Sequence, residues 1–194
     1  MKRKACEITD PVVIEKILTG TNIGRMATTD ENGYPYITPV NFVFHIGNIY
    51  FHCALNGEKL DNIQRDNRVG FQVDIPLAYL DSGFTQQRSP CKLHQFYHCV
   101  IIRGKARVVT DQQIKVDALN ALVQKHEKGA ALDKVHADMP EAKACAVVEI
   151  VPERLSAKSD LAQGKSESVR AALAEYLKQR NLPIDPETVQ EMGF

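Results

Sequence analysis

The chain has 194 residues, of which 44% are hydrophobic, and its 24 Lys and Arg residues equal its 24 Asp and Glu residues in number. This length suits one domain with a substantial core and a small appendage. Because a chain without net charge has no global field to attract nucleic acid or an anionic membrane, we expect neither as a partner.

The sequence carries no evident targeting signal or membrane-spanning segment. Its first ten residues, MKRKACEITD, lack the apolar stretch of a secretory signal. The apolar runs at 99–102 and 144–151 are too short to cross a bilayer. The five cysteines are scattered and form no Cys-x-x-Cys pair, which is typical of a reducing compartment. We therefore expect a soluble cytoplasmic protein.

The first half of the chain predicts one helix followed by a series of strands. Asp10 can cap a helix over 10–19, with Pro11 in its first turn. The segments IGRMATT, YPYITPVNFVF and IYFHCA are rich in strand-forming residues, and the turns DENG and HIGN separate them. This pattern predicts an antiparallel meander. EKLDNIQRDN then has helical spacing, and RVGFQVDI returns to a strand.

The second half begins with a segment whose apolar residues follow neither the helical nor the strand spacing. Residues 76–96 are expected to form a mobile or substrate-facing loop. YHCVIIRGKARVVTD predicts a long strand with a bend or bulge at Gly104. Asp111 caps the predicted helix DQQIKVDALNALVQKHEKG, and ACAVVEIVPERLSAKS predicts two strand segments broken at Pro152. An amphipathic helix is expected over about 166–180, followed by a short terminal piece.

The predicted elements indicate a mainly β fold. Six or seven strands with short turns and few helices predict an antiparallel β-barrel that closes on itself, with peripheral helices packed outside. Closure would remove the edge strands that such a sequence otherwise exposes.

Three segments stand in a characteristic order: GRMATTDENGYPYITPVNFVF, IYFHCALNGEKLDNIQRDNRVGF and YHCVIIRGKARVV. Together they resemble the pyridoxamine 5'-phosphate oxidase-like split-barrel flavoproteins, and among these the nitroimidazole-resistance-like proteins. The resemblance covers residues 1–158, which we expect to form an FMN-binding split β-barrel domain. Residues 159–194 lie outside the resemblance and are expected to form a C-terminal helical extension.

The resemblance implies a homodimer that binds FMN at the subunit interface. Two strands would lie along the flavin ring. Their matching residues are Thr38, Pro39, Val40, Asn41, Phe51, His52, Cys53 and Ala54. Lys59 would bind the phosphate at a helix start, where free N–H groups and an ammonium favour an anion. His98 and Cys99 would face the flavin of the partner subunit.

The chain departs from the family pattern near the expected phosphate site. The pyridoxamine oxidases place a second basic residue immediately before the lysine, where this chain has Glu58. They also carry basic residues on the preceding strand, where this chain has the neutral run TPVNFVF. Two expectations follow: either phosphate binding depends on Arg25 as well, or the cofactor is bound weakly. The substrate residues of those oxidases include a C-terminal Trp, and this chain has no Trp. Pyridoxamine phosphate is therefore a poor specific assignment for the substrate.

Each candidate residue also fits a purely structural role. Lys59 is also consistent with an ordinary solvated lysine, and Arg25 with a residue that forms an ion pair at a strand edge. Cys53 fits a small core hydrophobe. His52 fits a satisfied histidine at a strand end, although its position in the family pattern favours a functional role near flavin or substrate.

Other site classes have weaker support. The run CKLHQFYHC gives Cys91, His94 and His98 metal-ligand spacing, but a structural zinc site needs a fourth ligand and none is evident nearby. We therefore expect no metal. The sequence has no Gly-x-Gly-x-x-Gly, phosphate-binding loop, His-Glu-x-x-His or Gly-x-Ser-x-Gly motif, so nucleotide-binding, zinc-protease and serine-hydrolase functions lack their main signals.

We therefore expect an FMN-dependent oxidoreductase, with His52 as its catalytic candidate. It would pass electrons from reduced flavin to a small organic acceptor such as a nitroaromatic compound. Since the flavin carries that chemistry, no protein nucleophile is needed. One alternative is a non-catalytic flavin or haem binder in which His52 or His98 contacts or ligates the cofactor. Another is a regulatory module that acts through the surface of its C-terminal helix.

Overall fold

The computed structural model describes residues 4–84, 90–129 and 131–194. Its strands are β1 (Glu7–Ile8), β2 (Ile23–Thr29), β3 (Pro35–Asn41), β4 (Val43–His45), β5 (Asn48–Cys53), β6 (Arg68–Leu80), β7 (His94–Val108) and β8 (Ala146–Asp160). Its α-helices are α1 (Pro11–Gly20), α2 (Glu58–Arg65), α3 (Gln112–His126), α4 (Pro140–Lys143), α5 (Glu167–Arg180) and α6 (Asp185–Met192). Two short 3-10 helices are η1 (Lys4–Cys6) and η2 (Pro90–Lys92).

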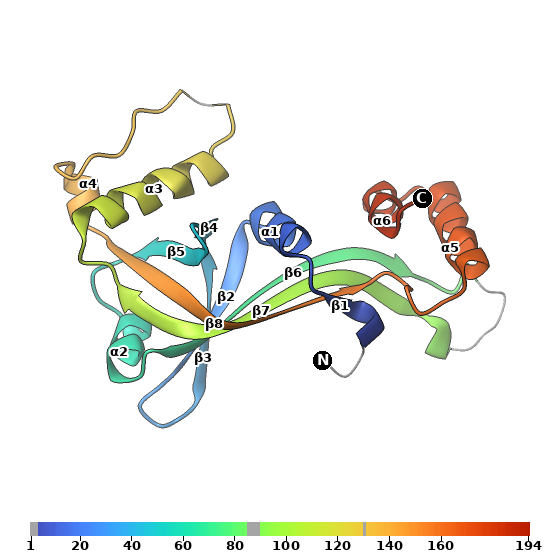
Figure 1. The fold of residues 1–194 in the computed structure, drawn as a ribbon, viewed down its shortest axis with the longest axis horizontal. Helices are drawn as coiled ribbons and strands as arrows, with labels where there is room; N and C mark the ends of the chain where they lie inside the picture. Colours follow the sequence, from blue (N-terminus) through green and yellow to red (C-terminus); the bar gives the residue numbers. More distant parts are fainter. Residues whose placement is uncertain (1–3, 85–89, 130) are drawn as a thin grey trace. The chain divides into compact units, whose positions relative to one another are not determined.

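All strands of the described residues belong to one sheet (Figure 1). Neighbours follow the order β3-β2-β6-β7-β8-β5-β4, and β1 pairs with β8. This confirms the predicted mainly β fold with helices. In the described part of the chain, no strand pairing joins β3 to β4, which differs from the predicted full closure. Only Phe42 separates these two strands, so the chain has no room to turn back between them.

The chain forms two compact units. Unit 1 contains the segment up to Asp10, Asp74–Cys99 and Ser156–Phe194, and unit 2 contains Pro11–Val73 and Val100–Leu155. Strands β6, β7 and β8 therefore each contribute residues to both units.

Unit 2 contains the predicted meander and the predicted helix after Asp111. The side chain of Asp111 accepts hydrogen bonds from the N–H groups of Gln113 (2.8 Å) and Ile114 (3.0 Å), which confirms the helix cap. Helix α3 lies against β4 and β5 (Figure 1). The core between these elements consists of Val43, Tyr50, Val109, Ala118, Leu119, Leu122, Ala142 and Val147.

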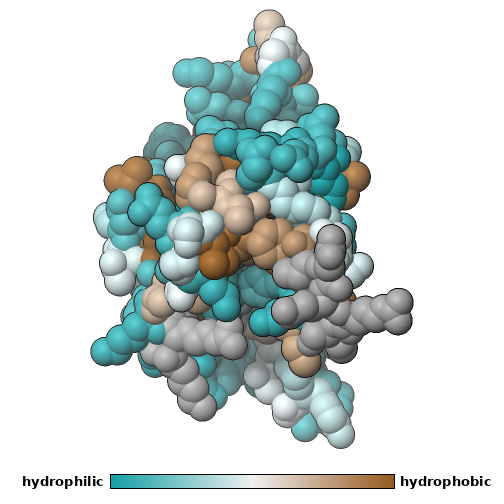
Figure 2. Space-filling view, turned by 90° about the vertical axis from the view of Figure 1, so that its right-hand side faces the viewer, coloured by the Kyte–Doolittle hydropathy of each residue, from teal (hydrophilic) through white to brown (hydrophobic). Residues whose placement is uncertain are grey.

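Unit 1 has its own core, made by strand residues and the C-terminal helices. It consists of Leu77, Ala78, Leu80, Phe96, Leu161, Leu173, Ala174, Leu177, Val189 and Met192. Ser166 caps α5, whose start matches the prediction, and the short terminal piece is the helix α6. On the face of the molecule drawn in Figure 2, apolar surface lies near the centre and hydrophilic surface borders it.

The predicted loop over 76–96 is wrong at both of its ends. Strand β6 continues to Leu80 and β7 already begins at His94, while residues 85–89 lie outside the described part. The strand residues are ordered here because Leu77, Leu80 and Phe96 are buried against α5 and α6. That apolar partner lies far away in the sequence, so local spacing does not reveal it.

The predicted break at Pro152 is also wrong, because β8 runs without interruption from Ala146 to Asp160. Gly104 of β7 explains how β8 continues past Pro152 without a break. A Cβ atom at Gly104 would lie 2.2 Å from the carbonyl oxygen of Val151 and 3.2 Å from Cα of Pro152. A glycine is therefore needed for the close approach of the two backbones at this position.

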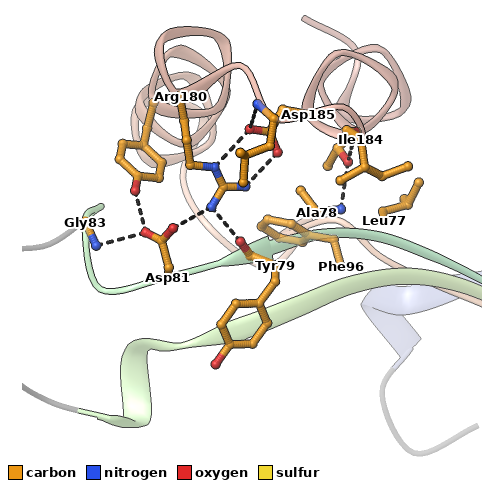
Figure 3. Close-up of polar contacts among 12 residues, drawn as sticks. Leu77, Ala78, Tyr79, Asp81, Gly83, Phe96, Arg180, Ile184 and Asp185 are labelled. Atoms are coloured by element: carbon orange, nitrogen blue, oxygen red, sulfur yellow. Dashed lines mark hydrogen bonds and ion pairs between the residues drawn. The ribbon is translucent and has the colours of Figure 1, made fainter.

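A buried charge network joins the C-terminal helices to β6 within unit 1 (Figure 3). The guanidinium of Arg180 contacts both carboxylate oxygens of Asp185 at 2.6 and 2.9 Å, and it donates to Asp81 and to the carbonyl of Tyr79 at 2.8 Å each. The Asp185 side chain is fully buried, whereas that of Arg180 is 13% exposed. In addition, the N–H of Ala78 donates to the buried Thr188 hydroxyl at 2.8 Å. Side chains of α5 and α6 thus bind backbone groups of β6.

The Arg180 hydrogen bonds hold the pKa of Asp185 below its usual value of 3.8, against the opposing effect of burial. A carboxyl group whose pKa is lowered by folding stabilises the folded state while it is ionised. This contribution is therefore present above pH 3.8 and is lost as the pH falls through the folded-state pKa.

We expect Arg180→Met to lower the free energy of unfolding by about 3–5 kcal/mol, because it leaves the Asp185 carboxylate buried without its partner. Denaturant titration at neutral pH measures the effect. Arg68→Gln is the matched control, since Arg68 pairs with Asp66 at 2.6 Å but its side chain is 78% exposed, and its loss should have little effect. Equal stability of the two variants would contradict the role of Arg180.

Candidate functional site

Helix α2 begins with an open N-terminus. Its N-cap residue is Gly57, whose φ is 137°, a value that L-residues with side chains rarely adopt. The Gly57 carbonyl accepts from the N–H groups of Leu60 at 2.8 Å and Asp61 at 3.2 Å. Because glycine has no side chain to bond the first-turn N–H groups, this helix start can accept an anion.

Lys59 stands at the second position of α2 and is partly buried. Its charge acts on the end of β5, because burial raises the pKa of the Cys53 thiol while the Lys59 ammonium opposes this shift. The structure thus places Lys59 within electrostatic range of Cys53, another of the sequence-predicted residues. Glu58 and Asp61 in the same turn add negative charge that offsets part of the favourable field.

The end of β5 presents its predicted residues on alternate sides. Phe51 is fully buried and pairs with Val148 of β8, so its side chain belongs to the core. His52 is exposed, Cys53 is partly buried and Ala54 is exposed. His52 is therefore the side chain of this strand end that is most available to a ligand.

The predicted residues of β3 divide between the two faces of the β2–β3 hairpin. The register pairs Arg25 with Pro39, and Ile23 with Asn41. These residues share an exposed face, on which Ile23 is 50% exposed. The alternate residues, Thr38 and Val40, pair with the inward-facing Met26 and Gly24.

Helix α2 packs on the inward face of β2. The Asn62 amide donates to the Thr28 hydroxyl at 3.0 Å, and both side chains are buried. Arg25 belongs to the other set of β2 residues, because successive side chains point to opposite faces. The structure therefore does not show Arg25 beside Lys59, and their joint role in phosphate binding stays a prediction.

His98 and Cys99 belong to unit 1, whereas the other predicted site residues belong to unit 2. His98 is buried, and its Nε2 lies 3.3 Å from a carboxylate oxygen of Glu191 in α6. Burial raises the pKa of the Cys99 thiol, with a further contribution from Asp74. Their approach to a partner's flavin stays a prediction.

Sequence reasoning did not single out the buried carboxylate of Glu149. It accepts hydrogen bonds from the Tyr50 hydroxyl (2.6 Å), the Asn48 amide (2.9 Å) and Arg107 Nε (2.6 Å). Burial alone would raise the Glu149 pKa, but these hydrogen bonds outweigh it and lower the pKa. A lone acidic residue within the apolar run ACAVVEIV was the available signal. Because its bonds are all made within unit 2, Glu149 is a structural centre of this unit.

Lys125, near the end of α3, is a second perturbed residue that the sequence did not reveal. Its Nζ lies 3.7 Å from the centre of the Phe42 ring and donates to the Leu18 carbonyl at 3.1 Å. Burial lowers the Lys125 pKa from 10.5 to about 8. A shifted pKa can mark a functional group, but these contacts also account for Lys125 as a packing residue.

No group of three or more His, Cys, Asp and Glu side chains forms a metal site among the described residues. Of the candidate ligands, His94 Nε2 lies 3.3 Å from Asp160, and His98 pairs with Glu191. A hollow of about 720 Å³ beside α2 is lined by Leu55, Asn56, Leu60, Asp61, Ile63, Gln64, Arg65, Asp66, Asn67, Ala106, Arg107 and Val108. This lining includes none of the sequence-predicted site residues, so the hollow gives them no added support.

The family model described as pyridoxamine 5'-phosphate oxidase matches residues 10–159. The chain belongs to this family. The match includes the whole β2–β5 region and helix α2, and thus the candidate phosphate-binding start at Gly57 and Lys59. Among curated proteins, none matches the chain. No helix in the described ranges has the length and apolar character needed to span a membrane.

Solved structures confirm the split β-barrel fold of this pyridoxamine 5'-phosphate oxidase family member. A candidate 5-nitroimidazole antibiotic resistance protein of Bacteroides thetaiotaomicron is 22% identical, with a TM-score of 0.67 over 79% of this chain and 86% of that one. The flavocytochrome Anf3 of Azotobacter vinelandii is also 22% identical, with a TM-score of 0.67 over 80% and 69%. A FAD and haem binding protein of Mycobacterium smegmatis is 16% identical, with a TM-score of 0.70 over 86% and 79%.

We expect stability to depend on the protonation of Lys125. Between pH 8 and 10.5 the unfolded chain holds the Lys125 proton more tightly than the folded one, so stability should rise with pH across this window. Lys125→Met should remove that rise, while Lys128→Met, at an exposed lysine just beyond α3, should retain it. Denaturant titrations across the window measure the difference, and parallel curves for the parent and Lys125→Met would contradict the shift.

Proposed function

We propose that the protein binds FMN and acts as an oxidoreductase that passes electrons from reduced flavin to a small organic acceptor, such as a nitroaromatic compound. Family membership supports a flavin-binding role. The observation that carries the choice of a phosphate-bearing flavin is the open start of α2, where Gly57 leaves the first-turn N–H groups unbonded by a cap side chain and Lys59 adds a positive charge.

The residues present fit an FMN phosphate at this helix start. A Cβ atom at Gly57 would meet no atom within 4 Å, so there is room for a ligand group beside the backbone. The first-turn N–H groups and the Lys59 ammonium would hold the phosphate, and the end of β5 would lie beside the rest of the cofactor. Glu58 weakens this anion site by its charge, which suits moderate affinity.

The bound flavin supplies the electron-transfer chemistry, and the protein binds and orients the reactants. His52 is the proposed catalytic residue. Its imidazole is exposed at the end of β5, next to Cys53 and within the same strand end that leads to Lys59. There it would contact the acceptor and exchange a proton with it. In this proposal Thr38, Pro39, Val40 and Asn41 provide the backbone that borders the flavin ring.

We further propose that two chains form a homodimer with the flavin at the subunit interface. The outward face of the β2–β3 hairpin supports this, because Ile23 is 50% exposed and Ile37 is 62% exposed on the face that also holds Arg25. A second subunit that covers this face would bury apolar surface and bring Arg25 into the shared site.

Two further assignments accompany this proposal. The first is a cytoplasmic location, which the five free cysteines support. The second is the division of the chain into an FMN-binding domain, residues 1–158, and a C-terminal extension, residues 159–194. The end of the family match at residue 159 supports that boundary.

A non-catalytic flavin or haem binder is the second candidate function. The flavocytochrome and the FAD and haem binding protein among the similar folds favour it. Of the two histidines considered as haem ligands, His52 is exposed, whereas His98 is buried and already paired with Glu191. The absorption spectrum of the purified protein and the mass of the molecule released on denaturation distinguish flavin from haem. A flavin without reductant-dependent turnover would favour the binding role.

Lys59→Ala is expected to weaken FMN binding by about 1.5–3 kcal/mol, the range for hydrogen bonds to charged groups, which is roughly tenfold to a hundredfold in affinity. Riboflavin has no phosphate, so it should bind the variant and the parent almost equally. Fluorescence titration of both ligands against both proteins gives the comparison.

Lys128→Ala is the matched control for this experiment, because Lys128 is an exposed lysine outside the candidate site. It should bind FMN as the parent does. An unchanged FMN affinity in Lys59→Ala would return Lys59 to the role of a solvated lysine, and an equal loss for riboflavin would point to damage of the barrel.

We expect light scattering of the flavin-loaded protein to give the mass of a dimer, twice the 21.7 kDa of one chain. Ile37→Lys, which places a charge on the exposed hairpin face, should shift the protein toward the monomer and weaken flavin binding. Leu132→Lys, at an apolar residue that is 55% exposed and lies outside the hairpin, is the matched control for the added charge. A monomeric parent that retains its flavin would exclude a shared site.

A further inference from the structure

Unit 1 contains a pocket that the proposed flavin chemistry does not use. Its volume of about 910 Å³ is within the size range of small-molecule sites. Described residues from the N-terminal segment, β6, η2, β7 and the start of α5 line it. They are Lys4, Ala5, Cys6, Leu80, Phe84, Cys91, Lys92, Leu93, His94, Phe96, Asp160, Ala162, Gly164, Lys165, Val169 and Leu173.

The floor of this pocket is apolar and well supported. Leu80, Phe96 and Leu173 line it and belong to the buried core of unit 1. Phe84 packs against the same core and meets the Tyr176 ring edge to face, with 5.6 Å between ring centres. Such a floor would accept the apolar part of a ligand without rearrangement of the core.

The charged residues around this floor favour an anion. Lys4, Lys92 and Lys165 all line the pocket and are exposed. Within the described ranges, these three ammonium groups form no ion pair with a carboxylate. Among the lining residues that the structure describes, Asp160 is the one acidic side chain, and it lies 3.3 Å from His94 Nε2. This described lining thus carries more positive than negative charge.

We propose that this pocket binds a small organic anion with an apolar body, specifically a carboxylate with an alkyl or aryl chain. The apolar part would rest on Leu80, Phe96 and Leu173, and the carboxylate would lie among the lysines at the rim. Residues 160–173, which supply part of the lining, follow the segment that matches the family model. The rest of the described lining comes from the N-terminal segment and from residues 80–96, so the C-terminal region completes a pocket whose other wall lies mostly within the family match.

A pair of fluorescent probes tests the preference for an anion on an apolar body. Anilinonaphthalenesulfonate carries a negative charge, and phenylnaphthylamine has the same rings without it. The full-length protein should bind the anionic probe more tightly, and octanoate should displace it at a lower concentration than octanol does. Equal binding of the two probes, or equal displacement by acid and alcohol, would overturn the anion preference.

Two sets of variants locate the binding. Lys92→Gln with Lys165→Gln should weaken the anionic probe by about twofold to fivefold per lysine, the range of exposed charge pairs, and should affect the neutral probe less. The control is Lys178→Gln with Lys128→Gln, at exposed lysines outside the pocket, and it should bind as the parent does. An equal loss of probe affinity in the control would show that the effect comes from general surface charge, and it would overturn the proposal.

Gly164→Phe tests the pocket itself. A Cβ atom at Gly164 would meet no atom within 4 Å, so the variant should fold while its ring takes up space in the pocket. It should weaken the binding of both probes by about tenfold or more, because the ring would block the apolar contacts that the probes make with the floor of the pocket. An unchanged melting temperature shows that the core is intact. Normal probe binding by this folded variant would place the probes elsewhere and overturn the proposal.

Discussion

The continuity of β6, β7 and β8 is the constraint on which the rest of the structure depends. Each of these strands supplies residues to both compact units. Within unit 1, Leu77, Ala78 and Leu80 of β6 and Phe96 of β7 pack in one core with α5 and α6. Within unit 2, Val147 of β8 packs in a second core with α3, β4 and β5. Strands of 13–15 residues are much longer than usual, and these two cores support them at different points.

The candidate site follows from how one strand ends. β5 finishes at Cys53, and four residues later Gly57 allows the chain to enter α2 with its first N–H groups open. A serine or aspartate at this position would cap the helix with its own oxygen and would compete with an anionic ligand. Gly57 thus leaves α2 without a side-chain cap, and for the same reason the start of α2 is available to an anion.

Local patterns predicted the parts of the fold that local forces determine. The strand-forming segments of β2 to β5, the cap at Asp111 and the turn at Asp30 all rest on neighbouring residues, and the structure confirms them. The ordering of Leu77 and Leu80 depends on helices about one hundred residues away, so their spacing carried no signal.

The site shows a similar limit. The proximity of Lys59 and Cys53 follows from a short connection that the sequence displays. The packing of α2 on the Thr28 side of β2 joins residues 34 positions apart, and the Tyr50–Glu149 hydrogen bond joins residues 99 positions apart. Neither can be obtained from motif order, because both require knowing which elements become neighbours.

The contact at Gly104 has a consequence for how the sequence can vary. The carbonyl of Val151 occupies the space of a side chain at position 104, whereas a Cβ atom at Gly70 would meet only the Ala27 methyl at 3.7 Å. Both glycines lie within strands, yet only the first is fixed by the backbone of another strand. Position 104 is therefore closed to every other amino acid unless β8 moves, while position 70 is open to at least alanine. Libraries that diversify this barrel should keep the former constant.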